Sequence, residues 1–228
     1  MWAFENTWCI VGLIVLTVGL RVLFARHDVL RSHRPVILEV LDSLLIAVLL
    51  VFCILRPFVV QAFYIPSGSM EPGLQQGDRL LVNKFVYFFR EPKVGDIVVF
   101  DAPPNALYQD STKQKKDFIK RVVGVPGDHI AVRENRLYRN GVPVVEPYIK
   151  EAPTYGWPDV TDPNAEVVVP PGHLLMFGDN RNDSNDGHLW RTMNPDGSSE
   201  PSPFLPRANV LGKATFTFWP WYRVGVLH

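Results

Sequence analysis

The first sixty residues contain two long apolar runs. Residues 8–20 are apolar apart from one threonine and two glycines, and residues 44–55 form twelve unbroken apolar positions. With its flanks, each run is long enough to cross a hydrocarbon core about 30 Å thick. We therefore predict two transmembrane helices, at residues 1–24 and 40–60, joined by a loop at residues 25–39.

The basic residues near these runs predict how the chain crosses the membrane. The arginines are Arg21, Arg26, Arg31 and Arg34, and the only acid among them is Asp28. Short basic loops stay on the cytoplasmic side, which places both termini outside. No basic residue precedes Arg21, so the first run lacks the basic start of a cleaved signal peptide. We expect a multi-pass protein of the plasma (inner) membrane, with residues 61–228 on its periplasmic or extracytoplasmic face.

After residue 60 the pattern changes to short apolar runs separated by glycine and proline. Such runs are typical of strands, and Asn140-Gly141 is a strong hairpin signal. No long helical period follows, so we predict a mostly-β antiparallel domain whose interior shares one curled sheet system. The predicted strands are 79–84, 97–100, 118–123, 129–132, 167–169, 174–177 and 210–218. The polar segments 102–116, 151–166 and 192–206 are predicted loops.

Composition narrows the classes of function. The 23 basic and 23 acidic residues balance, which argues against a nucleic-acid partner, because phosphates require a basic surface. Both cysteines, Cys9 and Cys53, fall inside the apolar segments, so we expect neither a disulfide framework nor thiol chemistry in the outer domain.

A serine stands in a rigid turn shortly after the second apolar segment. Ser69 lies between Pro66 and Pro72, whose rings fix φ, and Gly68 lets the backbone approach a partner closely. A hydroxyl held in this way is a candidate nucleophile if the chain supplies a base. The ordinary alternative is a linker that leaves the membrane.

Lys120 is the candidate base. It interrupts an apolar strand and shares a face with Phe118 and Val122. Burial disfavours the charged ammonium, and only a neutral amine can take a proton from serine. The alternative is a lysine that snorkels or pairs with Asp117. The histidines of the domain, which suggest no Ser–His–Asp arrangement, are His129, His173, His188 and His228.

The segment 178–187 is rich in side-chain oxygens and raises the question of a calcium loop. In the EF-hand register that begins at Asn182, the twelfth position would need Glu but holds Met193. A turn formed by Asx side chains around Arg181 fits better. No His or Cys pairs occur at ligand spacing, so we predict no metal and no cofactor.

Four segments in this order, 67–72, 77–84, 120–128 and 178–186, resemble the type I signal peptidases. These are membrane-bound serine–lysine proteases that remove signal peptides from exported proteins. The resemblance extends to the two apolar segments. It implies a signal-peptidase/SOS-repressor-like β fold as the catalytic domain, with a small insertion around residues 131–166.

The resemblance also implies a role for individual residues. Ser69 would be the nucleophile and Lys120 the general base, and Ser67 and the Ser69 backbone N–H would form the oxyanion hole. Ser184 would hydrogen-bond and orient the lysine amine. The residues implied to support this site are Asp179, Asp186 and Arg121. The chain departs from the family at Gly187-His188, where members often have Ser-Arg, and at Gly73, so the usual Asp–Arg brace is in question.

The expected substrate is the signal peptide of a secreted preprotein. Nine residues separate Val60 from Ser69, so the nucleophile lies within about 30 Å of the bilayer. Apolar residues around the nucleophile and base predict shallow pockets that suit an A-x-A-like end. These residues are Phe63, Ile65, Pro66, Met70, Phe118 and Ile119. The lipid bilayer is a second expected partner, and the translocon is a candidate third.

Two other interpretations stay open. The first is a specialised Ser–Lys peptidase that matures a few exported substrates. The second is a non-catalytic, membrane-tethered β-domain of the export machinery, although a binding module needs neither Ser69 nor Lys120. The self-cleaving SOS repressors share the serine–lysine logic, but they need a DNA-binding domain and no membrane spans, which excludes them.

Overall fold

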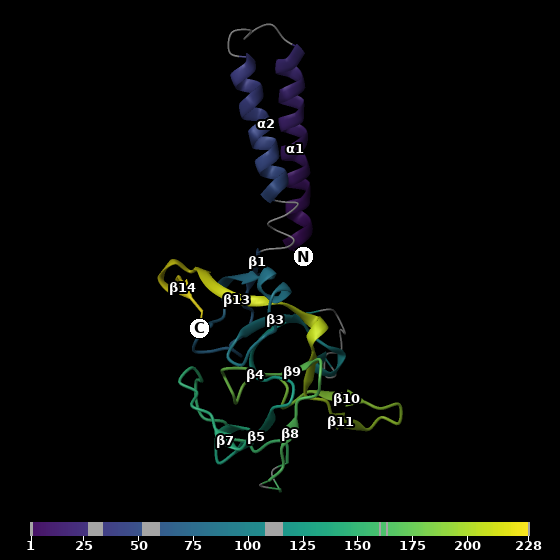
Figure 1. Ribbon diagram of the computed structural model, residues 1–228, viewed down its shortest axis with the longest axis vertical. Helices are drawn as coiled ribbons and strands as arrows, with labels where there is room; N and C mark the ends of the chain where they lie inside the picture. Colours follow the sequence, from purple (N-terminus) through teal and green to yellow (C-terminus); the bar gives the residue numbers. More distant parts are fainter. Residues whose placement is uncertain are drawn as a thin grey trace. The chain divides into compact units, whose positions relative to one another are not determined.

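The computed structural model describes residues 2–26, 34–51, 60–107, 116–159, 161–162 and 164–227 (Figure 1). The chain divides into two compact units, Met1–Val60 and Gln61–His228.

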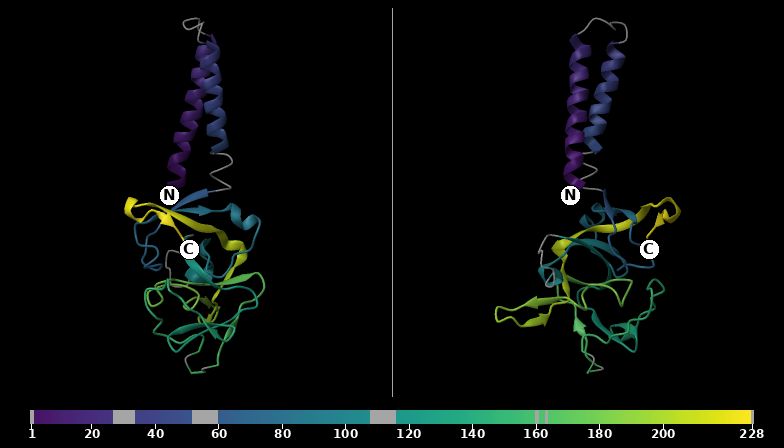
Figure 2. Two further views of the ribbon diagram at one scale, coloured as in Figure 1. Left: turned by 60° about the vertical axis from the view of Figure 1, so that its left-hand side comes forward. Right: turned by 180° about the vertical axis from the view of Figure 1, so that it is seen from behind.

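The first unit is a pair of helices, α1 (Trp2–Arg26) and α2 (Arg34–Leu50). The two helices lie side by side (Figures 1 and 2), and Arg21 forms an ion pair with Asp42 across them. Pro35 occupies the first turn of α2, where its missing N–H costs no hydrogen bond. Within the described part of the chain, neither helix combines the length and the hydropathy needed to cross a membrane.

The helix bounds differ from the predicted segments. The second helix begins at Arg34, six residues before the predicted start at residue 40, and the end of the predicted segment, residues 52–59, lies outside the described residues. The predicted membrane spans therefore stay a prediction.

The second unit is built on an eight-stranded sheet with the order β1-β2-β13-β3-β4-β9-β12, and β14 pairs with β13. Strand β13 pairs antiparallel with β2 and β3, and β4 pairs antiparallel with β3 and β9. The strands are β1 (Val60–Tyr64), β2 (Arg79–Asn83), β3 (Ile97–Asp101), β4 (Asp117–Gly124), β9 (His173–Phe177), β12 (Phe204–Pro206), β13 (Val210–Trp219) and β14 (Gly225–Val226). Short 3₁₀ helices connect them: η2 (Phe85–Phe88), η3 (Pro104–Leu107), η4 (Arg207–Asn209) and η5 (Trp221–Arg223).

A separate four-stranded sheet, with the order β7-β6-β5-β8, is inserted between β4 and β9. Its strands are β5 (His129–Arg133), β6 (Arg136–Arg139), β7 (Val142–Pro143) and β8 (Val167–Val168). Asn140 and Gly141 have φ of 54° and 74°, as the predicted hairpin requires. At the base of the insertion, the Gly127 and Val169 N–H groups donate to the carbonyls of Val169 and Asp128, both at 2.9 Å.

The antiparallel, mostly-β prediction is confirmed, but the single sheet system is wrong. Beyond Gly124 the chain turns through Val125-Pro126-Gly127, and Pro126 has no N–H with which to continue a ladder, so the following strands form their own sheet. The predicted loop 192–206 also contains regular structure. It holds most of the projecting hairpin of β10 (Arg191–Met193) and β11 (Ser199–Pro201), and then β12 (Figure 2).

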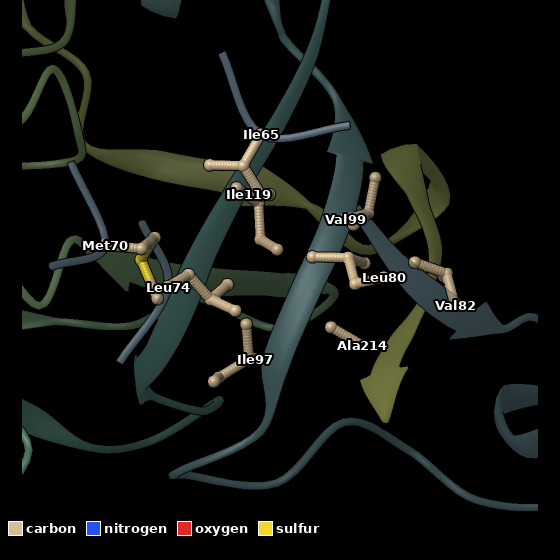
Figure 3. Packing of buried hydrophobic residues seen from close by; sticks show 9 residues of the cluster. All are labelled: Ile65, Met70, Leu74, Leu80, Val82, Ile97, Val99, Ile119 and Ala214. Carbon is tan, nitrogen blue, oxygen red and sulfur yellow. The ribbon is translucent and has the colours of Figure 1, made fainter. Parts of the chain in front are cut away.

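Buried apolar residues form three clusters in the second unit. The first lies beneath the serine turn, and Figure 3 shows Met70 and Leu74 beside Ile97 and Ile119. Met70 and Leu74 are fully buried. Burial of each such side chain contributes about 1.5–3 kcal/mol, so these two residues anchor the part of the turn that follows Ser69 to the core.

Candidate active site

The serine turn connects β1 to β2, and hydrogen bonds at its ends hold it closed. Ile65 N–H donates to Asp78 O and Gly77 N–H donates to Ile65 O, both at 2.9 Å. Within the turn, Leu74 N–H donates to Met70 O at 3.0 Å. The Ser69 side chain is thereby presented from a turn of fixed shape.

Lys120 reaches this serine from β4, with 2.7 Å between its Nζ and Ser69 Oγ. The lysine is only 5% exposed. Burial lowers the pKa of Lys120 to about 8, although the charges of Asp186 and Asp179 oppose the shift. A neutral amine next to a serine hydroxyl is therefore accessible near physiological pH, as a general base requires.

Ser67 lies on the other side of the nucleophile. Its Oγ donates to Ser69 Oγ at 3.4 Å, a long hydrogen bond, and its side chain is exposed. The position predicted for an oxyanion donor is thus next to the reacting hydroxyl.

Asn180 fixes the backbone of the serine turn, a role that the sequence analysis missed. Its N–H donates to Ser69 O and its Nδ2 to Gly68 O, both at 3.1 Å. The available signal was its place in the segment 178–186, which the family resemblance had already singled out.

Two buried arginines tie the surrounding loops together. Arg121 donates to both carboxylate oxygens of Asp179 at 2.8 and 2.7 Å, and stacks over the Tyr148 ring. Arg181 donates to both oxygens of Glu146 at 2.7 and 2.5 Å. The sequence analysis missed Glu146. A buried arginine needs a carboxylate partner, but nothing local indicates which one.

Asp186 is fully buried and accepts three hydrogen bonds. Gly178 N–H donates to one oxygen at 2.7 Å, while the other contacts His188 N and Nδ1 at 3.2 and 2.6 Å. The expected Asp–Arg brace is therefore an Asp–His brace in this chain. Gly187 between them has no room for a side chain, because a Cβ would lie 2.8 Å from Pro203 O.

Ser184 lies close to the nucleophile, but it makes no hydrogen bond to Lys120. Its Oγ is buried without a hydrogen-bond partner among the described residues, so the lysine-orienting role that the family resemblance implies stays a prediction. A Cβ on Gly178 would lie 2.3 Å from Ser184 Oγ and 2.5 Å from Ser69 O. The glycine therefore permits this close approach.

The residues predicted to form substrate pockets fall into two groups. Ile65 and Met70 are buried in the first core cluster, and Ile119 is only 9% exposed. They support the site from beneath, and their contact with a substrate stays a prediction. Phe63 and Phe118 are half-buried and Pro66 is exposed.

A buried amine hydrogen-bonded to a serine hydroxyl in a β-domain is the arrangement that a serine peptidase with a lysine base requires. The family model "Signal peptidase, peptidase S26" matches residues 37–219, and the chain belongs to that family. The resemblance predicted from the four segments is thus confirmed, as is a serine-type peptide hydrolase.

Two relatives, of 43% and 34% identity, agree with this assignment. A probable signal peptidase I-1 of Synechocystis sp. is 43% identical over 184 residues, covering 81% of this chain and 84% of the relative. A signal peptidase I of Pseudomonas aeruginosa is 34% identical over 246 residues, covering 86% and 81%. A crystal structure of a signal peptidase I from Enterococcus faecalis V583 is 22% identical, with a TM-score of 0.37 over 54% of this chain and 97% of that one.

Proposed function

We propose that this protein is a membrane-bound signal peptidase I that cleaves signal peptides from exported preproteins after A-x-A-like ends. The observation that carries the proposal is the 2.7 Å contact between Lys120 Nζ and Ser69 Oγ. The names of its relatives supply the substrate class.

In the proposed reaction, neutral Lys120 takes the proton of Ser69 Oγ as this oxygen bonds to the carbonyl carbon of the substrate. The Ser67 hydroxyl and the Ser69 N–H stabilise the resulting oxyanion. The lysine then gives its proton to the leaving amine as the peptide bond breaks. Water hydrolyses the acyl-enzyme with the same lysine as base, which returns Ser69 to its starting state.

The remaining polar residues hold this pair in place. Asp179, through Arg121, and Asp186 fix the loop that carries Asn180 and Ser184. Ser184 Oγ is buried near the nucleophile without a hydrogen-bond partner among the described residues, so its hydroxyl is available to hydrogen-bond to the lysine amine and orient it. This role rests on proximity.

An extended substrate fits beside the lysine. On the β9 side, strand β4 pairs with β9 at Arg121, Val122 and Gly124, all of which follow Lys120. The part of β4 before the lysine is therefore not paired with β9. A peptide strand can add to β4 on that side and bring its carbonyl to Ser69. The bulky Phe118 ring, whose centroid is 5.7 Å from Lys120 Nζ, narrows the space there, which favours small residues before the cleaved bond.

Exposed aromatic rings support a bilayer as partner. Phe88 and Phe89, at the end of η2, and Trp221 and Tyr222 in η5 are between 70% and 76% exposed. Such rings favour the interfacial region of membranes. In the first unit, Val15 and Ile46 are each 64% exposed, which suits a lipid environment. We place the second unit on the extracytoplasmic face, because the four arginines lie between the two apolar runs at residues 8–20 and 44–55.

The test is to determine the mature end of a model preprotein that has been incubated with the full chain in detergent. We expect Ser69→Ala to abolish cleavage and Lys120→Arg to be nearly as damaging, because a guanidinium stays protonated. The control is Lys93→Arg, at an exposed position, which should cleave normally. Substantial turnover by Lys120→Arg, or an acid pH optimum, would contradict the proposal.

The same assay tests specificity. Replacing either alanine of the A-x-A end by Phe or Lys should prevent cleavage, whereas changes at the middle position should be tolerated. Equal processing of Ala and Phe at the residue before the bond would defeat the proposed specificity. A wide panel of natural preproteins then separates a general signal peptidase from one that matures a few substrates.

A further inference from the structure

The two carboxylates that favour the charged form of Lys120 have different partners. Asp179 makes a two-pronged ion pair with Arg121, whose guanidinium stays positive at every working pH. Among the side chains that the structure describes, the one that pairs with Asp186 is His188. Lys120 therefore lies near two carboxylates in different surroundings. Asp179 is neutralised by the permanent charge of Arg121, whereas the side chain that contacts Asp186 is the imidazole of His188.

The imidazole is held rigidly. Its ring stacks on Tyr155 at 4.2 Å between centroids with planes 6° apart, and meets Phe177 edge-on at 5.9 Å. The other charged groups close to this aromatic pair are Arg181 and Glu146, which neutralise each other. Nδ1 is thereby aimed at Asp186, 2.6 Å away.

We propose that His188 is a positioning residue for the base: held by Tyr155 and Phe177, it fixes Asp186 through the contact of Nδ1 with the carboxylate and, unlike an arginine, places no permanent positive charge beside that carboxylate near Lys120. The inference rests on the proposed role of Lys120. It goes further by making residue 188 the determinant of the pH at which the site becomes active.

The consequence follows from the sign of the charges. A guanidinium keeps its proton at every working pH, whereas an imidazole can lose it. In the alkaline range in which Lys120 deprotonates, a histidine donor leaves the Asp186 charge in place, and this charge holds the proton on the lysine. An arginine at position 188 would cancel that charge, so the amine would become neutral at a lower pH.

The experiment compares His188→Arg with His188→Gln, which preserves a neutral donor. The full chain, labelled with ¹³C-lysine in detergent micelles, is titrated by NMR, and the Lys120 signal is assigned by its loss in Lys120→Arg. The pH dependence of kcat/KM on a model preprotein is recorded in parallel. We expect His188→Arg to lower both midpoints by roughly 0.5 to 1 pH unit, and His188→Gln to leave them within experimental error.

Asp186→Asn provides the matched control. It should lower the Lys120 midpoint by itself and remove the difference between histidine and arginine at position 188. If the His188→Arg variant does not fold, the Lys120 midpoints of His188→Gln and Asp186→Asn still test the proposal, which expects no shift in the first and a lower midpoint in the second. Equal shifts in the Gln and Arg variants, or no shift in Asp186→Asn, would overturn the proposal and leave His188 a purely structural residue. The two proposals can fail independently. Cleavage by Ser69→Ala would contradict the proposed function, whereas the NMR titration of Lys120 needs no turnover and tests only the inference about His188.

Discussion

Replacing Lys120 by methionine should make the protein more stable near neutral pH, although it removes the proposed base. Methionine keeps much of the length and volume of the lysine chain but carries no charge. Burial lowers the pKa of Lys120 from 10.5 to about 8, which corresponds to about 3 kcal/mol of unfavourable free energy for the charged form in the folded protein. Loss of the hydrogen bond to Ser69 offsets about 1 kcal/mol, leaving a net gain of about 2 kcal/mol.

The pH dependence of this gain is the sharper test. The unfolded chain binds the lysine proton more tightly than the folded one, so the penalty is fully present below pH 8. It fades as the pH rises from about 8 towards 10.5 and is absent above that range. Above pH 10.5 the variant should be slightly less stable than the wild type, because only the lost hydrogen bond remains.

The measurement is urea unfolding of the full chain in detergent micelles between pH 6 and 11, followed by the fluorescence of its buried tryptophans, Trp157 and Trp190. Lys93→Met, at an exposed position, controls for general effects of the substitution. A difference in unfolding free energy between Lys120→Met and the wild type that does not change with pH would refute the reasoning. It would mean that Lys120 keeps an ordinary proton affinity and cannot serve as a base near neutrality.

Other substitutions test separate parts of the site. Ser67→Ala should lower kcat about 10²–10³-fold with little change in KM, and an unchanged kcat in single-turnover assays would remove its oxyanion role. Ser184→Ala should move the midpoint of the pH–rate profile, whereas a profile changed only in height would leave the lysine unaffected. Glu146→Gln leaves a buried arginine unpaired and should destabilise the fold by about 3–5 kcal/mol in urea unfolding, so a loss below 1 kcal/mol would contradict the pair's importance. Gly187→Ser should lower the melting temperature, because its Cβ would meet a carbonyl at 2.8 Å, and wild-type stability would show that the loop can yield.

Much of the second unit could be predicted because the governing signals are local. The apolar run around Lys120 predicted strand 118–123, observed as Asp117–Gly124, and the hairpin at Asn140-Gly141 formed as expected. The same alternation placed the lysine side chain away from solvent. Period and turn chemistry act over a few residues, so they can be recognised in a single sequence.

Contacts between distant segments could not be predicted in this way. Glu146 and Arg181 are 35 positions apart, and Tyr155 stacks on His188 across a similar interval. No periodicity relates these residues, since their pairing depends on how the inserted sheet packs against the loop after β9. The burial of Met70 was missed for a related reason, because the cluster beneath the turn is assembled from five strands and their connections.

The closed base of the inserted sheet bears on how this domain can vary in evolution. Because the backbone bonds between Gly127, Asp128 and Val169 join the two ends of the insertion, its outer part can change in length without moving β4 or β9. Loop-closure entropy rises only by about 0.6 kcal/mol for each doubling of length. Not every part of the insertion can change in length, however, because Glu146 binds Arg181 and Tyr155 stacks on His188, both in the loop that follows β9. Length variation should therefore concentrate between residues 158 and 166, where a fused tag or a lineage-specific segment could be accommodated while the peptidase keeps its geometry.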